Sequence, residues 1–213
     1  MDNQNTIEAM NAPNRPGRPA ITVKQREEMR EKIAKEAKRL FQTEGYKQIS
    51  MRRIAKEIGC APMTLYKYYD AKIAILRTLW GSVFNDLFNA LDEIKFNDKA
   101  PRRWLSELSL GYVNYWIEHQ DHYRLVFMSE GVMQPDVSIF INNTEIVARF
   151  QIFSKSLMAL HDNQLNPDAL KCKLDALICF LHGIAHNKIT MSGYQWSHID
   201  DLVAIAIQGV ADS

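Results

Sequence analysis

The sequence has few cysteines, and they stand in no arrangement that suits a structural role. Cys60, Cys172 and Cys179 are the only three in 213 residues. An odd number, at spacings unlike those of zinc ligands, argues against both a disulfide framework and a zinc site. Cys172 and Cys179 are seven residues apart and share one face of a helix, where we expect small core residues rather than a redox pair.

Long apolar runs and leader signals are also lacking. No stretch approaches the roughly 20 consecutive apolar residues of a membrane span. The first residues do not show the charged-then-apolar order of a secretory signal peptide. We therefore expect a cytoplasmic protein with no membrane partner.

Signatures of strands and of enzymes are scarce as well. Branched and aromatic residues never alternate for long, and no Asn-Gly hairpin turn occurs. A nucleotide-binding loop, a zinc-protease helix motif and a nucleophile elbow are absent, so we expect no catalytic residues, no cofactor and no metal ligands. His182 and His186 have the i, i+4 spacing that suits a metal ion, which leaves a metal-dependent helical enzyme as the least favoured alternative.

Charge is nearly balanced in total but uneven along the chain. The formal net charge is +1. Residues 1–80 hold 16 Lys and Arg against 9 Asp and Glu, which leaves 10 against 16 for residues 81–213. A basic N-terminal part followed by an acidic C-terminal part indicates two parts with different tasks, and a polyanion is a candidate partner for the N-terminal part.

Helical periodicity runs through almost the whole sequence and predicts an all-α fold. Residues 1–21 are polar and hold three of the seven prolines, which is typical of a disordered arm. Thr22 and Gln25 then fit a capping box that begins a helix. We expect Gly45 to end that helix, because glycine adopts positive φ angles at low cost.

Two short helices should follow. The first is expected to begin after Ser50, a good N-cap, and to stop at Gly59. The second is expected from Pro62, favoured at a first helical position, to Tyr69, with Leu65 and Tyr69 pointing inward. Its outward side would carry Pro62, Met63, Thr64, Lys67 and Tyr68. Two such helices joined by a tight glycine turn form a helix-turn-helix, whose second helix enters the major groove of DNA.

A series of motifs follows the same layout. They are Ala37-Lys38-Arg39-Leu40-Phe41, Gly45-Tyr46, Ser50-Met51-Arg52-Arg53-Ile54-Ala55, Gly59, Thr64-Leu65-Tyr66-Lys67-Tyr68-Tyr69 and Lys72. With these motifs, residues 30–76 resemble the DNA-binding domain of the TetR family of bacterial regulators. The resemblance implies an N-terminal three-helix helix-turn-helix domain over residues 22–72. A C-terminal helical ligand-binding and dimerisation domain over residues 73–213 would follow, with double-stranded operator DNA as the partner.

The resemblance also implies roles for single residues. Thr64 and Tyr66 resemble the family's phosphate-contacting pair on the recognition helix, and Tyr68 stands at a position that also lies near phosphate. Lys72, at the start of the fourth helix, resembles the lysine that meets the DNA backbone.

Base reading would belong to other positions. Arg52 stands where some members place a base-reading arginine, and the operator sequence would be set by Pro62, Met63 and Lys67. Two residues depart from the family pattern: Ala61 replaces a capping serine or threonine, and Met63 replaces a small residue. The long apolar side chain of Met63 would touch a thymine methyl group or pack inward.

The N-terminal arm carries a separate hypothesis. Arg15-Pro16-Gly17-Arg18-Pro19 resembles the Arg-Gly-Arg-Pro core of minor-groove hooks, with an extra proline. Arg15 and Arg18 on an extended chain would enter a narrow, A·T-rich minor groove, where the negative potential is strongest. The alternative is an unstructured leader with two stray arginines.

Longer helices are expected in the C-terminal part. The expected segments are residues 71–94, a helix after Pro101, a break near Gln120, a loop over 131–136, and helices near 141–160, 167–190 and 197–210. Tyr123-Arg124-Leu125 with Phe127, and His182-Gly183, resemble the C-terminal subtype named for a Trp-His-Gly motif, although the tryptophan of that motif is missing here.

The family resemblance implies a homodimer through the last two helices and a pocket for a small effector. The apolar residues of those helices would supply a core face and a dimer face. The candidate pocket residues, each of which has plain core as its alternative, are Trp104, Tyr112, Trp116, Phe127, Met128, Phe150 and His182. We expect a hydrophobic or aromatic effector with one polar group near His182.

These observations together favour a ligand-responsive repressor that binds a palindromic operator as a dimer. An effector that binds the other conformation better would release the DNA. The alternative outside the enzymes is a helical interaction module that has lost DNA binding.

Overall fold

The described part of the chain is helical from end to end. The structure, a computed structural model, describes residues 22–95, 99–141 and 144–212, and no strand occurs among them. The all-α expectation is confirmed. The proposed arm, with Arg15 and Arg18, lies outside the described residues.

Three helices and one 3-10 turn form the N-terminal unit. They are α1 (Val23–Glu44), η1 (Tyr46–Gln48), α2 (Met51–Glu57) and α3 (Pro62–Leu65). The capping box is present as expected: the Thr22 hydroxyl accepts from the Gln25 amide, and the Gln25 side chain accepts from the Thr22 amide. Gly45 ends α1 with a φ of +83°, which a side chain would resist.

The core of this unit is the stripe that the helical spacing marks on α1. Ile33, Ala37 and Leu40 are almost completely buried. They pack with Ile54 of α2 and Leu65 of α3, which are equally inaccessible. A stripe of residues three and four apart therefore holds the two short helices against the long one.

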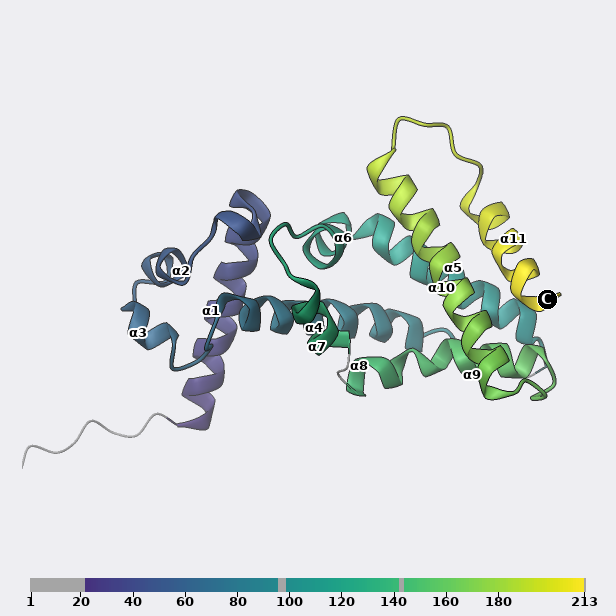
Figure 1. Cartoon of the computed structure of the whole chain (residues 1–213), viewed down its shortest axis with the longest axis horizontal. Helices are drawn as coiled ribbons and strands as arrows, with labels where there is room; N and C mark the ends of the chain where they lie inside the picture. Colours follow the sequence, from purple (N-terminus) through teal and green to yellow (C-terminus); the bar gives the residue numbers. More distant parts are fainter. Residues whose placement is uncertain (1–21, 96–98, 142–143, 213) are drawn as a thin grey trace, which may run out of the picture.

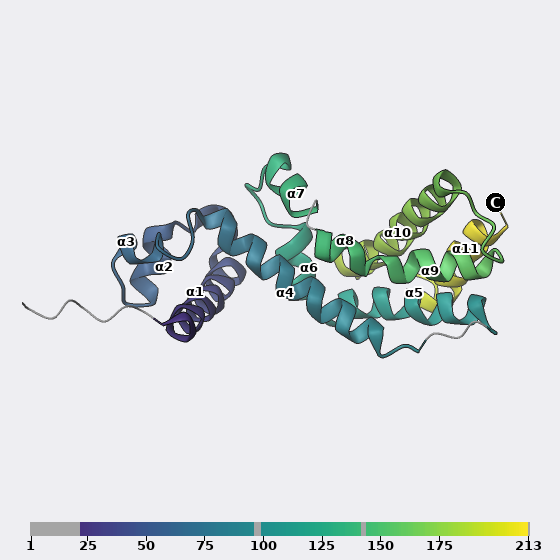
Figure 2. The ribbon, with the colours of Figure 1, turned by 90° about the horizontal axis from the view of Figure 1, so that it is seen from below.

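Helix α4 (Lys72–Asp92) connects the two parts of the chain. Figures 1 and 2 both show it running from the N-terminal helices into the C-terminal bundle. Its buried face is wider than one row of side chains spaced four residues apart, because a second such row of large side chains is also buried. The two rows are Ile75, Leu79, Val83, Leu87 and Leu91, and Leu76, Trp80, Phe84 and Phe88.

The C-terminal part is a bundle built around α5. Its helices are α5 (Pro101–Glu118), α6 (Gln120–Phe127), α7 (Gln134–Ile141), α8 (Thr144–Arg149), α9 (Gln151–Leu160), α10 (Pro167–Thr190) and α11 (Ile199–Ala211). Helices α9, α10 and α11 all pack on α5, and α10 packs along α11 (Figure 1). No described helix is both long enough and apolar enough to cross a membrane.

Three sequence-based expectations for this part are wrong in detail. One helix over 141–160 was expected, but the chain turns at Phe150, where backbone hydrogen bonds join residues three apart instead of four apart. The Phe150 ring packs against the Phe88 ring, with 4.8 Å between their centres. Helix α7 begins inside the expected loop. Cys172 and Cys179 are exposed and not in the core, because the buried stripe of α10 passes through Leu177 and Leu181 instead.

Candidate nucleic-acid interface

A tight turn joins α2 to α3 and sets the angle between them. Ser50 caps α2 by accepting from the Arg53 amide at 3.1 Å. Gly59 takes a φ of +73°, which allows the Cys60 amide to reach back to the Ala55 carbonyl at 3.0 Å. Pro62 then occupies the first turn of α3, where its missing N–H costs nothing. This is the helix-turn-helix layout that the sequence predicts.

Helix α3 presents a mixed surface of apolar, aromatic and basic side chains. Leu65 is fully buried and anchors the helix to the core. Met63 is 72% exposed and Tyr66 is 47% exposed, and Lys67 is exposed as well. Pro62 is exposed and Thr64 is half-buried. Met63 therefore points to solvent rather than inward, and its side chain is available to a partner.

The third helix is shorter than expected, and this changes the place of Tyr68. Helix α3 ends at Leu65, and the next residues continue as turns. The Tyr68 amide donates to the carbonyl of Leu65, three residues earlier, so the chain winds here more tightly than in an α-helix. Tyr68 is only 8% exposed, and Arg30 donates to its carbonyl at 2.9 Å. The expectation that Tyr68 faces outward is wrong.

Lys72 begins α4 as expected, but its ammonium group is bound to protein. The Nζ atom donates to the carbonyls of Tyr46 at 2.6 Å and Ile49 at 2.8 Å. It also lies 4.0 Å from the centre of the Tyr46 ring. Burial lowers the pKa of Lys72. Because an ammonium group has three N–H donors, one donor is left for a phosphate, and that contact stays a prediction.

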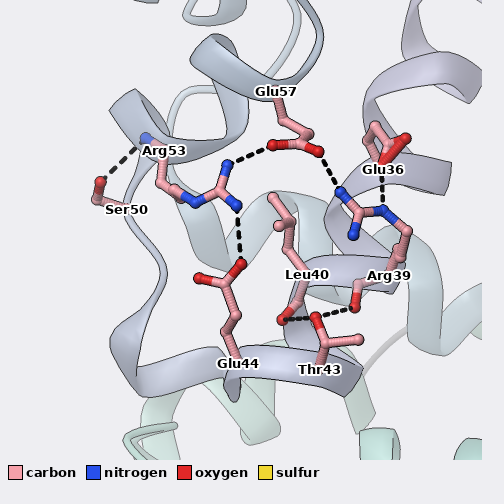
Figure 3. Close-up of polar contacts among 8 residues, drawn as sticks. All are labelled: Glu36, Arg39, Leu40, Thr43, Glu44, Ser50, Arg53 and Glu57. Carbon is pink, nitrogen blue, oxygen red and sulfur yellow. Dashed lines mark hydrogen bonds and ion pairs between the residues drawn. The ribbon is translucent and has the colours of Figure 1, made fainter.

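A charged cluster that the sequence reading missed ties α1 to α2 (Figure 3). Arg53 donates to Glu57 at 2.5 Å and to Glu44 at 2.8 Å. Arg39 donates to the same Glu57 carboxylate and, at 2.8 Å, to Glu36. Hydrogen bonding from Arg53 lowers the pKa of the Glu57 carboxyl. Glu57 thus links two helices through two arginines, and we name these five residues the Glu57 cluster.

Because of the Glu57 cluster, two arginines that are adjacent in the sequence have different surroundings. Arg53 is held by carboxylates, whereas Arg52 is exposed. The i, i+4 spacing of Arg53 and Glu57 is visible in the sequence, but Arg39 is 18 residues from Glu57, and only the fold brings them together. Arg52 is the arginine of the pair that a partner can reach.

An apolar cleft of about 1040 Å³ opens in the C-terminal part, between α4, α6, α8 and α10. Four of the expected pocket residues line it: Tyr112, Phe127, Phe150 and His182. The sequence reading missed Phe84, Phe140, Ile146, Ile178 and His186, which also line it. Their elements lie far apart in the sequence, and no local pattern shows that they face one space.

The other three expected pocket residues lie elsewhere. Trp104 and Trp116 are buried side chains of α5 and do not line the cleft. Met128 is 46% exposed and borders a different hollow, between α6 and the end of α1. Their assignment to the pocket is wrong, because helical spacing marks a buried face without saying whether packing fills it.

The spaced histidines are held by a tyrosine. The Tyr123 hydroxyl lies 3.1 Å from Nε2 of His182 and 2.7 Å from Nδ1 of His186. Within the described ranges, no three His, Cys, Asp or Glu side chains gather as a metal site would require.

Comparison with known proteins gives a family match for one segment and a fold for most of the chain. Residues 33–79 match the family model described as bacterial regulatory proteins, tetR family. A comparison with curated proteins found no significant match.

Solved structures resemble most of the chain. A putative tetR family transcription regulator from Shewanella sp. PV-4 is 15% identical, with a TM-score of 0.62, 86% of this chain covered and 96% of that one. A putative fatty acid metabolism regulator from Clostridium perfringens is 15% identical, with a TM-score of 0.61 and coverages of 84% and 96%. The TetR family regulator PfmR from Thermus thermophilus is 14% identical, with a TM-score of 0.56 and coverages of 84% and 97%.

At these identities the solved structures show the fold, while the family model identifies the segment that contains α2 and α3. Residues 33–79 thus resemble the tetR family of bacterial regulatory proteins, and the described chain consists of an N-terminal helix-turn-helix unit and a helical C-terminal part.

Proposed function

We propose that the chain is a repressor that binds a palindromic operator as a homodimer and is released by a small effector. The observation that carries this proposal is the surface of α3, where Met63, Tyr66 and Lys67 are exposed while Leu65 anchors the helix in the core. A helix of this kind fits the width of the major groove, where base edges are distinguishable. Arg52 and the hydroxyl of Thr64 would add base and phosphate contacts.

The proposed division of the chain places DNA binding in residues 22–72 and ligand binding with dimerisation in residues 73–213. Arg15 and Arg18 of the arm are proposed minor-groove contacts. Deleting residues 1–19 should then weaken operator binding at least several-fold, and unchanged affinity would remove the arm from the proposal.

The dimer is proposed to form through α10 and α11. Phe180 is 54% exposed on α10 and Ile205 is 67% exposed on α11, and Leu202 of α11 is half-buried. Their buried neighbours Leu181 and Ile207 already pack inside the chain. A second copy of this face would cover the exposed apolar side chains. It would also present two recognition helices to half-sites about 34–36 Å apart.

The effector is proposed to act through α4. Phe84 of α4 lines the apolar cleft, and Lys72 at the start of the same helix donates to the carbonyls of Tyr46 and Ile49, which precede α2. An occupant that moves Phe84 would therefore shift the start of α4 and the helix-turn-helix unit with it. It releases DNA only if it binds the released conformation better than the bound one.

The test is fluorescence anisotropy with the promoter region beside the chain's own gene, repeated across a salt series. Affinity should fall steeply with salt because phosphate contacts release counterions. Tyr66→Ala and Lys67→Ala should weaken binding. The matched controls Tyr194→Ala and Arg103→Ala, exposed residues far from α3, should not. Binding that is absent, or unaffected by both α3 variants, would favour the interaction module without DNA binding.

A further inference from the structure

Five phenylalanine and tyrosine rings line the apolar cleft. The rings come from α4, α5, α6, α7 and the α8–α9 turn, and they are Phe84, Tyr112, Phe127, Phe140 and Phe150. Phe84 lies 5.7 Å from Phe140 and 6.2 Å from Phe150 between ring centres. Edge-to-face and tilted rings of this kind pack against a flat aromatic guest as they pack against each other.

Polar atoms gather at one place in this wall. His182 lines the cleft, and its ring lies 4.4 Å from that of Phe127, nearly edge to face. Tyr123 is fully buried, and its hydroxyl contacts His182 on one side and His186 on the other. One hydroxyl has one proton, so Tyr123 donates to one imidazole and accepts from the other. This fixes the orientation of His182.

Few charged side chains line the cleft. Of the described residues that line it, Asp175 is the only carboxylate, and none is a lysine or arginine. Asp175 is exposed and paired with Lys171 on the same helix. Burial, to which the neighbouring His186 ring adds, lowers the pKa of His182, so its ring is neutral near pH 7.5. A charged guest would therefore lose its water shell without a partner of opposite charge.

As a refinement that rests on the proposed effector response, we propose that the cleft binds an uncharged aromatic molecule with one hydroxyl or carbonyl group. That group hydrogen-bonds to His182, and Tyr123 is the positioning residue that holds the imidazole. Aromatic rings also attract cations. None of the described residues that line the cleft supplies a buried carboxylate to complete such a site, so a cation is the competing guest to exclude.

Four probes with the same naphthalene ring test this assignment at pH 7.5: naphthalene, 2-naphthol, 2-naphthoate and 2-naphthylmethylammonium. A phenol stays protonated at this pH because phenolic pKa values lie near about 10. Titration calorimetry on the full chain should show 2-naphthol binding about tenfold or more tightly than either charged probe. Equal or tighter binding of the naphthoate or the ammonium probe overturns the proposal, as does the absence of saturable binding of every probe.

Two substitutions locate the hydrogen bond. His182→Phe keeps a ring in the wall and should reduce 2-naphthol affinity to that of naphthalene. Tyr123→Phe should lower 2-naphthol affinity several-fold while leaving naphthalene affinity unchanged, a split that a merely structural loss would not produce. His198→Phe and Tyr194→Phe are the matched controls, since both residues lie outside the cleft. Loss of affinity for both probes in both cleft variants would contradict the assigned hydrogen bond.

Operator binding is measured on the same samples, so that a failure of the proposed ligand class can be told from a failure of the proposed DNA binding and release. If 2-naphthol binds with the expected selectivity but leaves the operator complex intact, the ligand class stands and the proposed release by an effector fails. If the operator is bound and no uncharged probe enters the cleft, DNA binding stands and the ligand class fails.

Discussion

Lys38 of α1 and His122 of α6 meet where the N-terminal helices contact the C-terminal part, with Nζ 2.9 Å from Nε2. The other imidazole nitrogen, Nδ1, lies 2.9 Å from the Tyr115 hydroxyl, which is 3.1 Å from the Val83 carbonyl. A carbonyl only accepts, so Tyr115 donates to Val83 and accepts from Nδ1. In neutral His122 the Nε2 atom then has no proton and accepts from Lys38.

This arrangement predicts that the folded chain loses stability in acid. Burial, followed by the Lys38 ammonium, lowers the pKa of His122 below its ordinary value. The unfolded chain therefore takes up the proton first, and stability falls as the pH drops below about 6.5 towards the folded pKa. Asp121, 3.8 Å from Nε2, offsets part of the loss, while Asp86 and His119 act more weakly and with opposite signs.

The measurement is the melting temperature from pH 8 to pH 5 for the wild type and for His122→Gln. The amide can keep both hydrogen bonds but does not titrate, so its profile should be flatter below pH 6.5. His198→Gln, at the exposed start of α11, is the control and should follow the wild type. If the His122→Gln and wild-type profiles coincide, His122 does not sense pH.

Releasing the arginines of the Glu57 cluster should change how salt affects DNA binding. In Glu57→Gln, the Arg39 and Arg53 guanidinium groups lose their shared carboxylate. Operator affinity should rise at low salt, and the slope of log affinity against log salt should steepen by about one for each arginine that reaches a phosphate. Anisotropy from 50 mM to 300 mM salt measures this.

The matched control for that cluster is Glu107→Gln, which frees Arg103 on α5, far from the helix-turn-helix. Its salt slope should equal that of the wild type. A Glu57→Gln slope that also stays at the wild-type value would mean that neither arginine can reach DNA.

Lys72 should matter more for stability than an exposed lysine does. Lys72→Met leaves the carbonyls of Tyr46 and Ile49 without their shared donor, and the free energy of unfolding should fall by about 1–3 kcal/mol. Lys67→Met removes an exposed charge and should stay within about 0.5 kcal/mol of the wild type. Urea unfolding compares the two variants. Equal stabilities would show that the Lys72 contacts contribute little.

The proposed dimer should depend on the exposed face of α11. Ile205→Glu would bury a carboxylate in the interface of the dimer, so the chain should sediment as a monomer at low micromolar concentration and bind operator weakly. Val23→Glu, an equally drastic change at an exposed residue of α1, should leave sedimentation unchanged. A dimer that persists in Ile205→Glu would place the interface elsewhere.

Local rules were enough for the helix-turn-helix domain. Thr22, Gly45, Ser50, Gly59 and Pro62 act within a few residues of themselves, and each begins or ends a helix as their chemistry predicts. The buried stripes of α1 and α2 follow helical spacing for the same reason. Tyr68 is the exception, since where it points depended on how α3 ended.

The sequence by itself determined the helical class, the helix-turn-helix and the outward position of residues such as Pro62 and Lys67, because capping and periodicity are short-range effects. Only the tertiary structure decided that Arg53 belongs to a cluster while Arg52 is exposed, and that Phe84 and His182 face one cleft while Trp116 is core. Those outcomes depend on which helices pack together and how completely side chains fill the space between them, and no local pattern specifies either.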